Sequence, residues 1–114
     1  MANTYTEIHL QLVFAVQNRL SLITPLWKDR LHQYITAIVQ DHTHKMIIIN
    51  GMPDHIHAII GMRPIQSISD FLQEIKRDSS KWINQNKLAT GKFQWQDGYG
   101  AFSYKKSDLP TLIN

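Results

Sequence analysis

Residues 46–62, which read MIIINGMPDHIHAIIGM, decide the fold because they join two strand-like segments through a turn. Residues 46–49 form a continuous apolar run rich in β-branched side chains, which predicts a largely buried strand. Residues 50–53 are turn-forming, and the apolar segment 55–62 predicts a second strand. We therefore place two consecutive strands at the middle of the chain.

Four further segments surround this pair of strands. Residues 7–16 alternate apolar and polar side chains, which predicts a strand. Helical spacing predicts helices from Thr24-Pro25 to about residue 42, and from the capping pattern at 67–70 to about residue 86. Residues 93–104 predict a hairpin that turns at Asp97-Gly98. The order strand, helix, strand, strand, helix, hairpin predicts an α+β ferredoxin-like sandwich. Its antiparallel sheet carries both helices on one face, with the first and third strands at the centre.

Composition limits the class of protein. The chain has 114 residues, of which 43% are hydrophobic and 18% charged, so residues 1–114 predict one folded domain. The absence of cysteine excludes disulfides, thiolate metal sites and a Cys nucleophile. Twelve basic residues against nine acidic ones, with a pI of about 9.3, permit a polyanionic partner. Without a membrane-length apolar run or a signal peptide, we expect a cytoplasmic protein with no membrane partner.

The densest cluster of reactive groups is the sequence Asp54-His55-Ile56-His57. On a strand, His55 and His57 point to the same face about 7 Å apart, so both imidazoles can converge on one metal ion. Two nitrogen ligands leave coordination positions open for phosphate oxygens or water. A short H-x-H pattern is also compatible with two half-exposed histidines that have no ligand. The predicted position on the uncovered face of a central strand favours the metal site.

Other two-histidine chemistries fail on the sequence. Ile59 stands where a third alternating histidine would be needed, and no H-x-[ST] pair is present. His42-Thr43-His44 has the expected position of the first helix C-terminus, where a protonated histidine is favourable against the dipole. His9 either neighbours the histidine pair on the open face or is a structural residue.

Basic and aromatic side chains suggest contacts with nucleic acid, although each group has a structural alternative. The basic residues either form a solvated helix face or bind phosphates, and the candidates are Arg19, Lys76, Arg77 and Lys81. The aromatic residues either belong to the core or stack on bases, and they are Trp95, Tyr99, Phe102 and Tyr104.

Four segments together resemble the IS200-like transposases, the small single-tyrosine HUH enzymes of bacterial insertion sequences, with their REP-associated relatives. In chain order the segments are residues 8–19 (IHLQLVFAVQNR), 50–57 (NGMPDHIH), 75–80 (IKRDSS) and 93–103 (FQWQDGYGAFS). The resemblance implies that His55 and His57 hold a divalent cation, Mg²⁺ or Mn²⁺, which polarises the scissile phosphate of single-stranded DNA. It also implies a helix-borne tyrosine nucleophile, a 5′-phosphotyrosine intermediate, hairpin DNA as the partner, and a homodimer.

The sequence departs from this family at the nucleophile. The family tyrosine belongs to a Tyr-x-x-x-Gln stretch whose Gln is commonly a third metal ligand, and residues 107–114 resemble only the lead-in to that helix. We expect the family tyrosine beyond Asn114, because neither Tyr99 nor Tyr104 matches the position of the nucleophile. We therefore expect a transposase domain, residues 1–114, that lacks its catalytic helix and does not cleave DNA. A non-cleaving module that binds hairpin DNA and an unrelated sheet-based RNA-binding domain are the alternatives.

Overall fold

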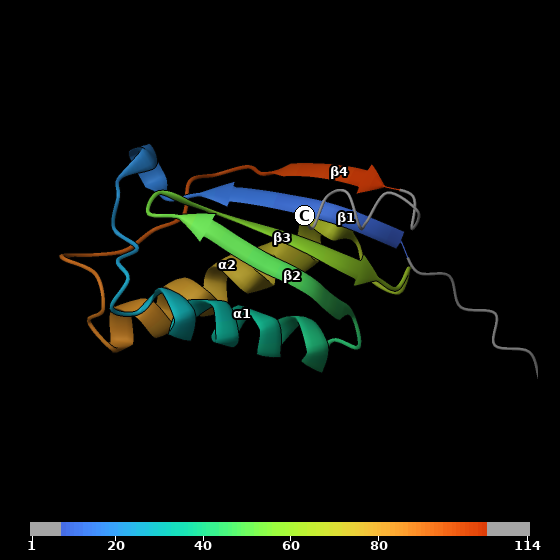
Figure 1. Ribbon diagram of the computed structural model, residues 1–114, viewed down its shortest axis with the longest axis horizontal. Coiled ribbons are helices and arrows are strands. Elements are labelled where there is room, and N and C mark those ends of the chain that lie inside the picture. Colours follow the sequence, from blue (N-terminus) through green and yellow to red (C-terminus); the bar gives the residue numbers. More distant parts are fainter. Residues whose placement is uncertain (1–7, 105–114) are drawn as a thin grey trace, which may run out of the picture.

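The computed structural model describes residues 8–104, which form a four-stranded antiparallel sheet and two helices (Figure 1). The elements are β1 (Ile8–Ala15), a 3₁₀ turn η1 (Gln17–Arg19), α1 (Lys28–Asp41), β2 (Lys45–Met52), β3 (His55–Met62), α2 (Ile68–Gln85) and β4 (Gly100–Tyr104). The strand order is β2-β3-β1-β4. This arrangement confirms the α+β class, the two helices and the central position of the first and third strands.

The two faces of the sheet follow from strand alternation. Both helices cover one face of the sheet (Figure 1). From residue 10 of β1 and residue 56 of β3 onward, the even-numbered side chains of the central strands are buried on that face: Leu10, Leu12, Phe14, Ile56, Ala58, Ile60 and Met62. The helices add their apolar stripes to the same core: Leu31, Ile35 and Val39 from α1, and Phe71, Leu72, Ile75 and Ile83 from α2. The odd-numbered side chains of β1 and β3 therefore belong to the opposite face, which we call the open face.

The helix boundaries agree in part with the sequence. The helix α2 begins where predicted, because the Ser67 side chain accepts a hydrogen bond of 3.1 Å from the Asp70 backbone N–H. The helix α1 begins later than predicted: Trp27 has φ −132°, so residues 24–27 form a turn and the regular helix starts at Lys28. None of the helices within residues 8–104 is long and apolar enough to cross a membrane.

The prediction that residues 46–49 are a largely buried strand is wrong in burial and in length. The strand β2 runs from Lys45 to Met52 and is an edge of the sheet, so Ile47, Ile48 and Ile49 are only half-buried. A register irregularity between Met46 and Ile48 interrupts its pairing with β3. A continuous apolar run fits a half-covered edge strand as well as a central one.

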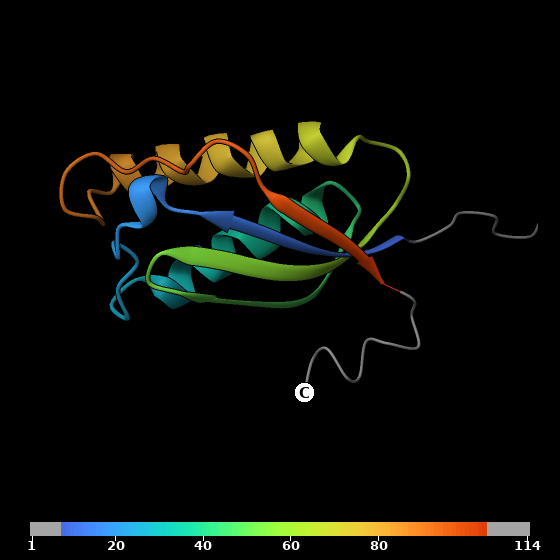
Figure 2. The ribbon, with the colours of Figure 1, turned by 90° about the horizontal axis from the view of Figure 1, so that it is seen from above.

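The predicted hairpin over residues 93–104 is also wrong. Residues 93–96 do not pair with β4. Instead, residues 93–96 and β4 follow one another along the same edge of β1, and both are antiparallel to it (Figure 2). Trp95 is opposite Val16, whereas Gly100 is opposite Val13, so two extra residues interrupt this edge. Gly98 has φ +83°, which favours glycine, and the Asp97-Gly98 pair makes an interruption in one edge rather than a turn between two strands.

Candidate functional site

The histidine pair lies on the open face of β3, as the alternation predicted. The His55 and His57 rings are nearly parallel, with centroids 5.0 Å apart and an interplanar angle of 18°. Both side chains are half-buried. On the two neighbouring strands, Ala15 and Met52 are the register partners of His55, while Val13 and Asn50 flank His57. The pair thus faces outward from the middle of the sheet, near the end where β1 leaves it.

One histidine of the pair has a charged partner beside it. His55 Nδ1 is 2.7 Å from Asp54 Oδ1, and the other carboxylate oxygen accepts a 3.0 Å hydrogen bond from Arg19 Nε. The hydrogen bond from His55, followed by the contact with Arg19, holds the pKa of Asp54 below its usual value. This pairing of Arg19 with Asp54 was not predicted, although the Asp-His adjacency is visible in the sequence.

The other histidine is kept neutral by its surroundings. Burial first, and then the neighbouring His55 imidazole, lower the pKa of His57. A neutral imidazole offers a lone pair to a metal ion, whereas a protonated one does not. The environment of His57 at neutral pH therefore suits a metal ligand.

The geometry of the pair is compatible with a shared divalent cation. Two imidazole nitrogens that are each about 2 Å from one metal lie at most about 4 Å apart, which rings with centroids 5.0 Å apart allow. Within residues 8–104, no cluster of three or more His, Cys, Asp or Glu side chains that could hold a metal is present. A complete coordination shell therefore needs water, substrate oxygens or a ligand from outside these residues.

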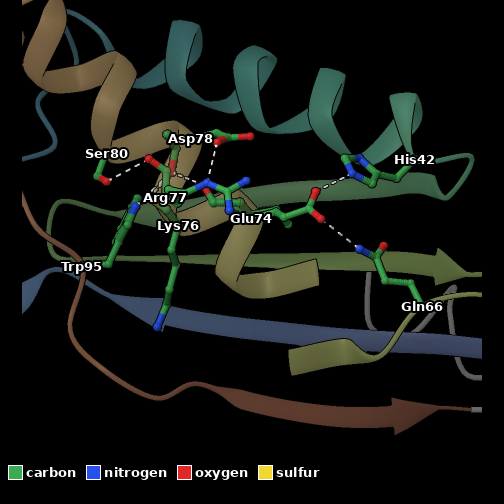
Figure 3. Close-up of polar contacts among 10 residues, drawn as sticks. His42, Gln66, Glu74, Lys76, Arg77, Asp78, Ser80 and Trp95 are labelled. Atoms are coloured by element: carbon green, nitrogen blue, oxygen red, sulfur yellow. Dashed lines mark hydrogen bonds and ion pairs between the residues drawn. The ribbon is translucent and has the colours of Figure 1, made fainter. Parts of the chain in front are cut away.

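The four basic residues do not form one surface. The Lys76 side chain extends from α2 toward the edge of the sheet (Figure 3). Its ammonium donates hydrogen bonds to two carbonyls of the segment before β4, that of Gln96 at 2.8 Å and that of Gly98. Burial lowers the pKa of Lys76, although Asp97 opposes that effect. Lys76 thus holds the interrupted edge of the sheet in place.

Arg77 and Lys81 are the exposed basic side chains of α2. The Arg77 side chain is 68% exposed, and its Nε donates a 3.1 Å hydrogen bond to Asp78 (Figure 3). Arg77 also lines a shallow cleft of about 240 Å³ between α2 and residues 94–97. Arg19 and Arg77 each use one nitrogen for a carboxylate and remain exposed. Lys81 is exposed as well, whereas Lys76 is committed to two carbonyls.

The aromatic side chains divide between core and surface. Trp95 is 8% exposed, packs edge-on against Phe14, and donates a 2.9 Å hydrogen bond to Ser79 Oγ. Phe102 is 54% exposed on β4 and lies opposite Gln11 on the open face. Trp95 is therefore a core residue, whereas Phe102 is accessible for stacking.

The described tyrosines lie away from the histidine pair. Tyr34 on α1 stacks on Trp82 of α2, with centroids 4.7 Å apart, so it belongs to the helical layer. Tyr99 lines a cleft with residues 69–76 of α2, on the side of the sheet opposite the open face. For Tyr104 the backbone is paired with His9.

The segment where the family nucleophile is expected lies outside the described residues. The predicted lead-in helix spans residues 107–114, and the family tyrosine is expected beyond Asn114, whereas the structure describes residues 8–104. Tyr5 lies outside the described residues as well. The expectation of a catalytic tyrosine beyond Asn114 therefore stays a prediction.

His42 and His44, near the end of α1, have structural roles. His42 follows α1, as predicted; its Nδ1 is 2.8 Å from the Ile38 carbonyl oxygen, and its Nε2 pairs with Glu74 (Figure 3). The bond to the helix carbonyl, and then Glu74, raise the pKa of His42 despite some opposing burial. His44 is buried and accepts a 3.0 Å hydrogen bond from the Arg63 backbone N–H.

The sequence leaves two alternatives for His9, a place beside the histidine pair or a structural role. The strand register decides between them. His9 is opposite Gly61, whereas His57 is opposite Val13. Four residues along β1 separate those two positions, a distance of about 13 Å. His9 is 9% exposed, so it is a buried residue apart from the pair.

Comparisons with known proteins agree on one family. The profile of the family described as "Transposase IS200 like" matches residues 4–114. A curated relative, the ISDra2 transposase TnpA of Deinococcus radiodurans, is 25% identical over 75 residues, which cover 66% of this chain and 54% of the relative. This chain thus spans about half the length of that relative.

Two solved structures share the fold. A crystal structure of a candidate transposase from Deinococcus radiodurans R1 has a TM-score of 0.76 at 18% identity, covering 99% of this chain and 92% of the other. A REP-associated tyrosine transposase bound to a REP hairpin has a TM-score of 0.70 at 16% identity. The match covers 99% of this chain and 67% of the other. At these identities the likeness concerns the fold.

Proposed function

Because the chain belongs to the IS200-like transposase family, we propose that it is the metal-binding and DNA-binding part of an enzyme of DNA transposition. The observation that carries this proposal is the pair His55 and His57 on the open face of a central strand. The family resemblance supplies the substrate, single-stranded DNA with a hairpin end. The REP hairpin bound by one structural relative supports the same class of ligand.

In this proposal His55 and His57 hold a divalent cation, Mg²⁺ or Mn²⁺. When bound, the cation would supply charge stabilisation at a scissile phosphate. The protein's part is to present two nitrogen ligands on a rigid strand, with the His57 imidazole kept neutral by burial. Since Mg²⁺ prefers an all-oxygen shell and imidazole suits Mn²⁺, Mn²⁺ is expected to bind more tightly in vitro.

Basic side chains supply the sequence-independent part of DNA binding. We assign direct phosphate contacts to Arg77 and Lys81, because both are exposed. Arg19, which is 59% exposed, retains guanidinium nitrogens beyond the one bound to Asp54. Lys76 contributes indirectly, because its two hydrogen bonds fix residues 96–98 at the edge of the sheet.

We further propose that residues 1–114 bind DNA without cleaving it. In-line attack requires a nucleophile at the metal-bound phosphate. Tyr34 lies in the helical layer and Tyr99 in a cleft with α2, so neither side chain faces the histidine pair. The position of these tyrosines also favours the second candidate function, a hairpin-binding module that does not cut.

A homodimer and a cytoplasmic location complete the proposal. The strand β4 is an edge of the described sheet and carries the exposed Phe102, so its free edge could pair with a second copy. Light scattering at high concentration tests the dimer, and a monomer throughout the concentration range would refute it. The location follows from the family's DNA substrate.

The proposed DNA binding is tested with a labelled hairpin oligonucleotide and fluorescence anisotropy across salt concentrations. Replacing Arg77 and Lys81 with Gln should weaken binding and flatten the salt slope by about 1.4, or about 0.7 for each lost phosphate contact. A control with the same net charge, Lys28→Gln with Lys45→Gln, should leave most of the slope in place. Equal slopes for both double variants would remove Arg77 and Lys81 from the DNA interface.

The absence of cleavage is tested separately. The 114-residue chain is incubated with labelled hairpin DNA and Mn²⁺ and then run on a denaturing gel. We expect no covalent band, whereas a chain extended beyond Asn114 by a helix that begins Tyr-x-x-x-Gln should produce one. A band from the 114-residue chain that disappears in Tyr99→Phe or Tyr104→Phe would identify a nucleophile within the chain and contradict the proposal.

A further inference from the structure

Backbone hydrogen bonds from the segment that follows β1 hold the turn between β2 and β3 in place. The Asp54 carbonyl accepts a 2.8 Å hydrogen bond from the Val16 backbone N–H, and the Pro53 carbonyl accepts a 3.0 Å bond from Ile23. These two bonds attach the two residues before His55, Pro53 and Asp54, to separate segments of backbone. The Asp54 side chain therefore starts from a preorganised position.

The side-chain contacts extend this arrangement to the histidine. One Asp54 carboxylate oxygen is 2.7 Å from His55 Nδ1, and the other accepts the 3.0 Å bond from Arg19 Nε. An ionised carboxylate can only accept hydrogen bonds, so the proton between the two groups belongs to His55 Nδ1. A neutral His55 with its proton on Nδ1 has its lone pair on Nε2.

We propose that Asp54 and Arg19 are positioning residues that hold His55 as the Nδ1–H tautomer, so that Nε2 is the atom presented to the cation. This inference rests on the proposed metal-binding function. Arg19 fixes the carboxylate from its far side, and thus acts on the histidine through Asp54. Carboxylates that accept the second N–H of a ligating histidine fix its tautomer and ring orientation and raise its basicity.

The backbone conformation at Arg19 supports its role as a positioning residue. Asn18 and Arg19 have φ of 58° and 55°, in the left-handed region that residues with side chains seldom adopt. Through this turn, residues 17–19 reverse the chain after β1, and the Arg19 backbone N–H donates a 2.8 Å bond to the Val16 carbonyl. The guanidinium is thus brought back to the carboxylate beside the histidine pair.

The direct test reads the tautomer without metal. Nitrogen-15 chemical shifts and long-range proton couplings of His55, measured on the full 114-residue chain at neutral pH, should report a proton on Nδ1. Asp54→Ala should return His55 toward a mixture of tautomers, and Asp54→Asn, which keeps an acceptor oxygen, should preserve the Nδ1–H form. A mixture in the unmodified chain, or no change in Asp54→Ala, would overturn the inference.

Metal affinity gives the second readout, with Mn²⁺ alone as the probe. Asp54→Ala should weaken Mn²⁺ binding by about 10- to 100-fold, with Asp54→Asn between it and the unmodified chain. Arg19→Gln should weaken binding less than Asp54→Ala. The matched control, Asp78→Ala, breaks the Arg77–Asp78 pair elsewhere and should change neither tautomer nor affinity.

The two readouts separate this inference from the proposed function. Asp54 could instead act only as a metal ligand, without setting the tautomer of His55. Asp54→Ala would then reduce Mn²⁺ affinity while the tautomer of the metal-free chain stayed the same, which would overturn the positioning role. An unmodified chain with the Nδ1–H tautomer but no Mn²⁺ binding would support the positioning of His55 and refute the proposed metal site. Mn²⁺ binding together with a mixture of tautomers would support the proposed metal site and refute the positioning of His55.

Discussion

Removing the hydroxyl of Ser79 should destabilise the protein more than the size of the change suggests. Ser79 is fully buried in α2, where its Oγ accepts the 2.9 Å hydrogen bond from Trp95 Nε1 and donates to the Ile75 carbonyl. Trp95 belongs to the segment that continues the sheet edge beside the end of β1. Ser79→Ala therefore leaves a buried indole N–H without its partner.

The expected loss follows from two opposing effects. An unsatisfied buried donor costs about 1–3 kcal/mol. Replacing Ser with Ala inside a helix returns about 0.5 kcal/mol. The net loss is then about 0.5–2.5 kcal/mol. For 114 residues, an unfolding entropy of about 2.1 cal/mol/K per residue gives a melting temperature about 4 °C lower for each kcal/mol.

Urea denaturation measures this loss, and the neighbouring serine provides a matched control. Ser80→Ala makes the same chemical change in the same helix but removes only an exposed hydrogen bond to the Arg77 carbonyl, so its effect should stay within about 0.5 kcal/mol. The Trp95→Phe and Ser79→Ala double-mutant cycle should give a coupling of about 1 kcal/mol. Equal stability of Ser79→Ala and Ser80→Ala, or no coupling to Trp95, would show that the hydrogen bond from Trp95 to Ser79 does not stabilise the fold.

Two further predictions concern packing and pH. Gly51→Ala should destabilise the protein by about 1–3 kcal/mol in urea denaturation, because the new Cβ would lie 2.7 Å from the His55 backbone oxygen; unchanged stability would show that β2 can shift. Glu74→Gln should lower the pKa of His42 in an NMR titration, and an unchanged pKa would attribute the rise to the Ile38 carbonyl and Asp41 alone. Because folding raises this pKa, the stabilisation by His42 is complete below about pH 6.5, the unfolded value, and is lost as the pH rises through the folded value.

The central part of the fold could be predicted because its signals are local. Alternation placed the core side chains of β1 on one face, and the Ser67 capping pattern located the start of α2 within a residue. The same period of two put His55 and His57 on one face. These features depend on neighbours in the sequence, so a single chain reveals them.

The failures have non-local causes. Asp97-Gly98 suits a tight turn and therefore predicts a hairpin between residues 93–96 and 99–104, yet both segments pair with β1. Whether β2 lies at an edge depends on the strand order, which the apolar run 46–49 does not encode. The roles of Arg19 and Lys76 depend on carbonyls and a carboxylate at least 20 residues away, which sequence spacing cannot place.

Titration calorimetry with Mn²⁺ tests whether His55 and His57 form a metal site on the open face. The unmodified chain should bind Mn²⁺ at neutral pH, with affinity falling below about pH 6 as the imidazoles protonate. The double variant His55→Ala, His57→Ala should lose this binding. The control His32→Gln, His42→Gln, which removes one imidazole from α1 and one from the residue that follows it, should keep it. Equal Mn²⁺ affinity in the unmodified chain and in the His55, His57 double variant would contradict the account.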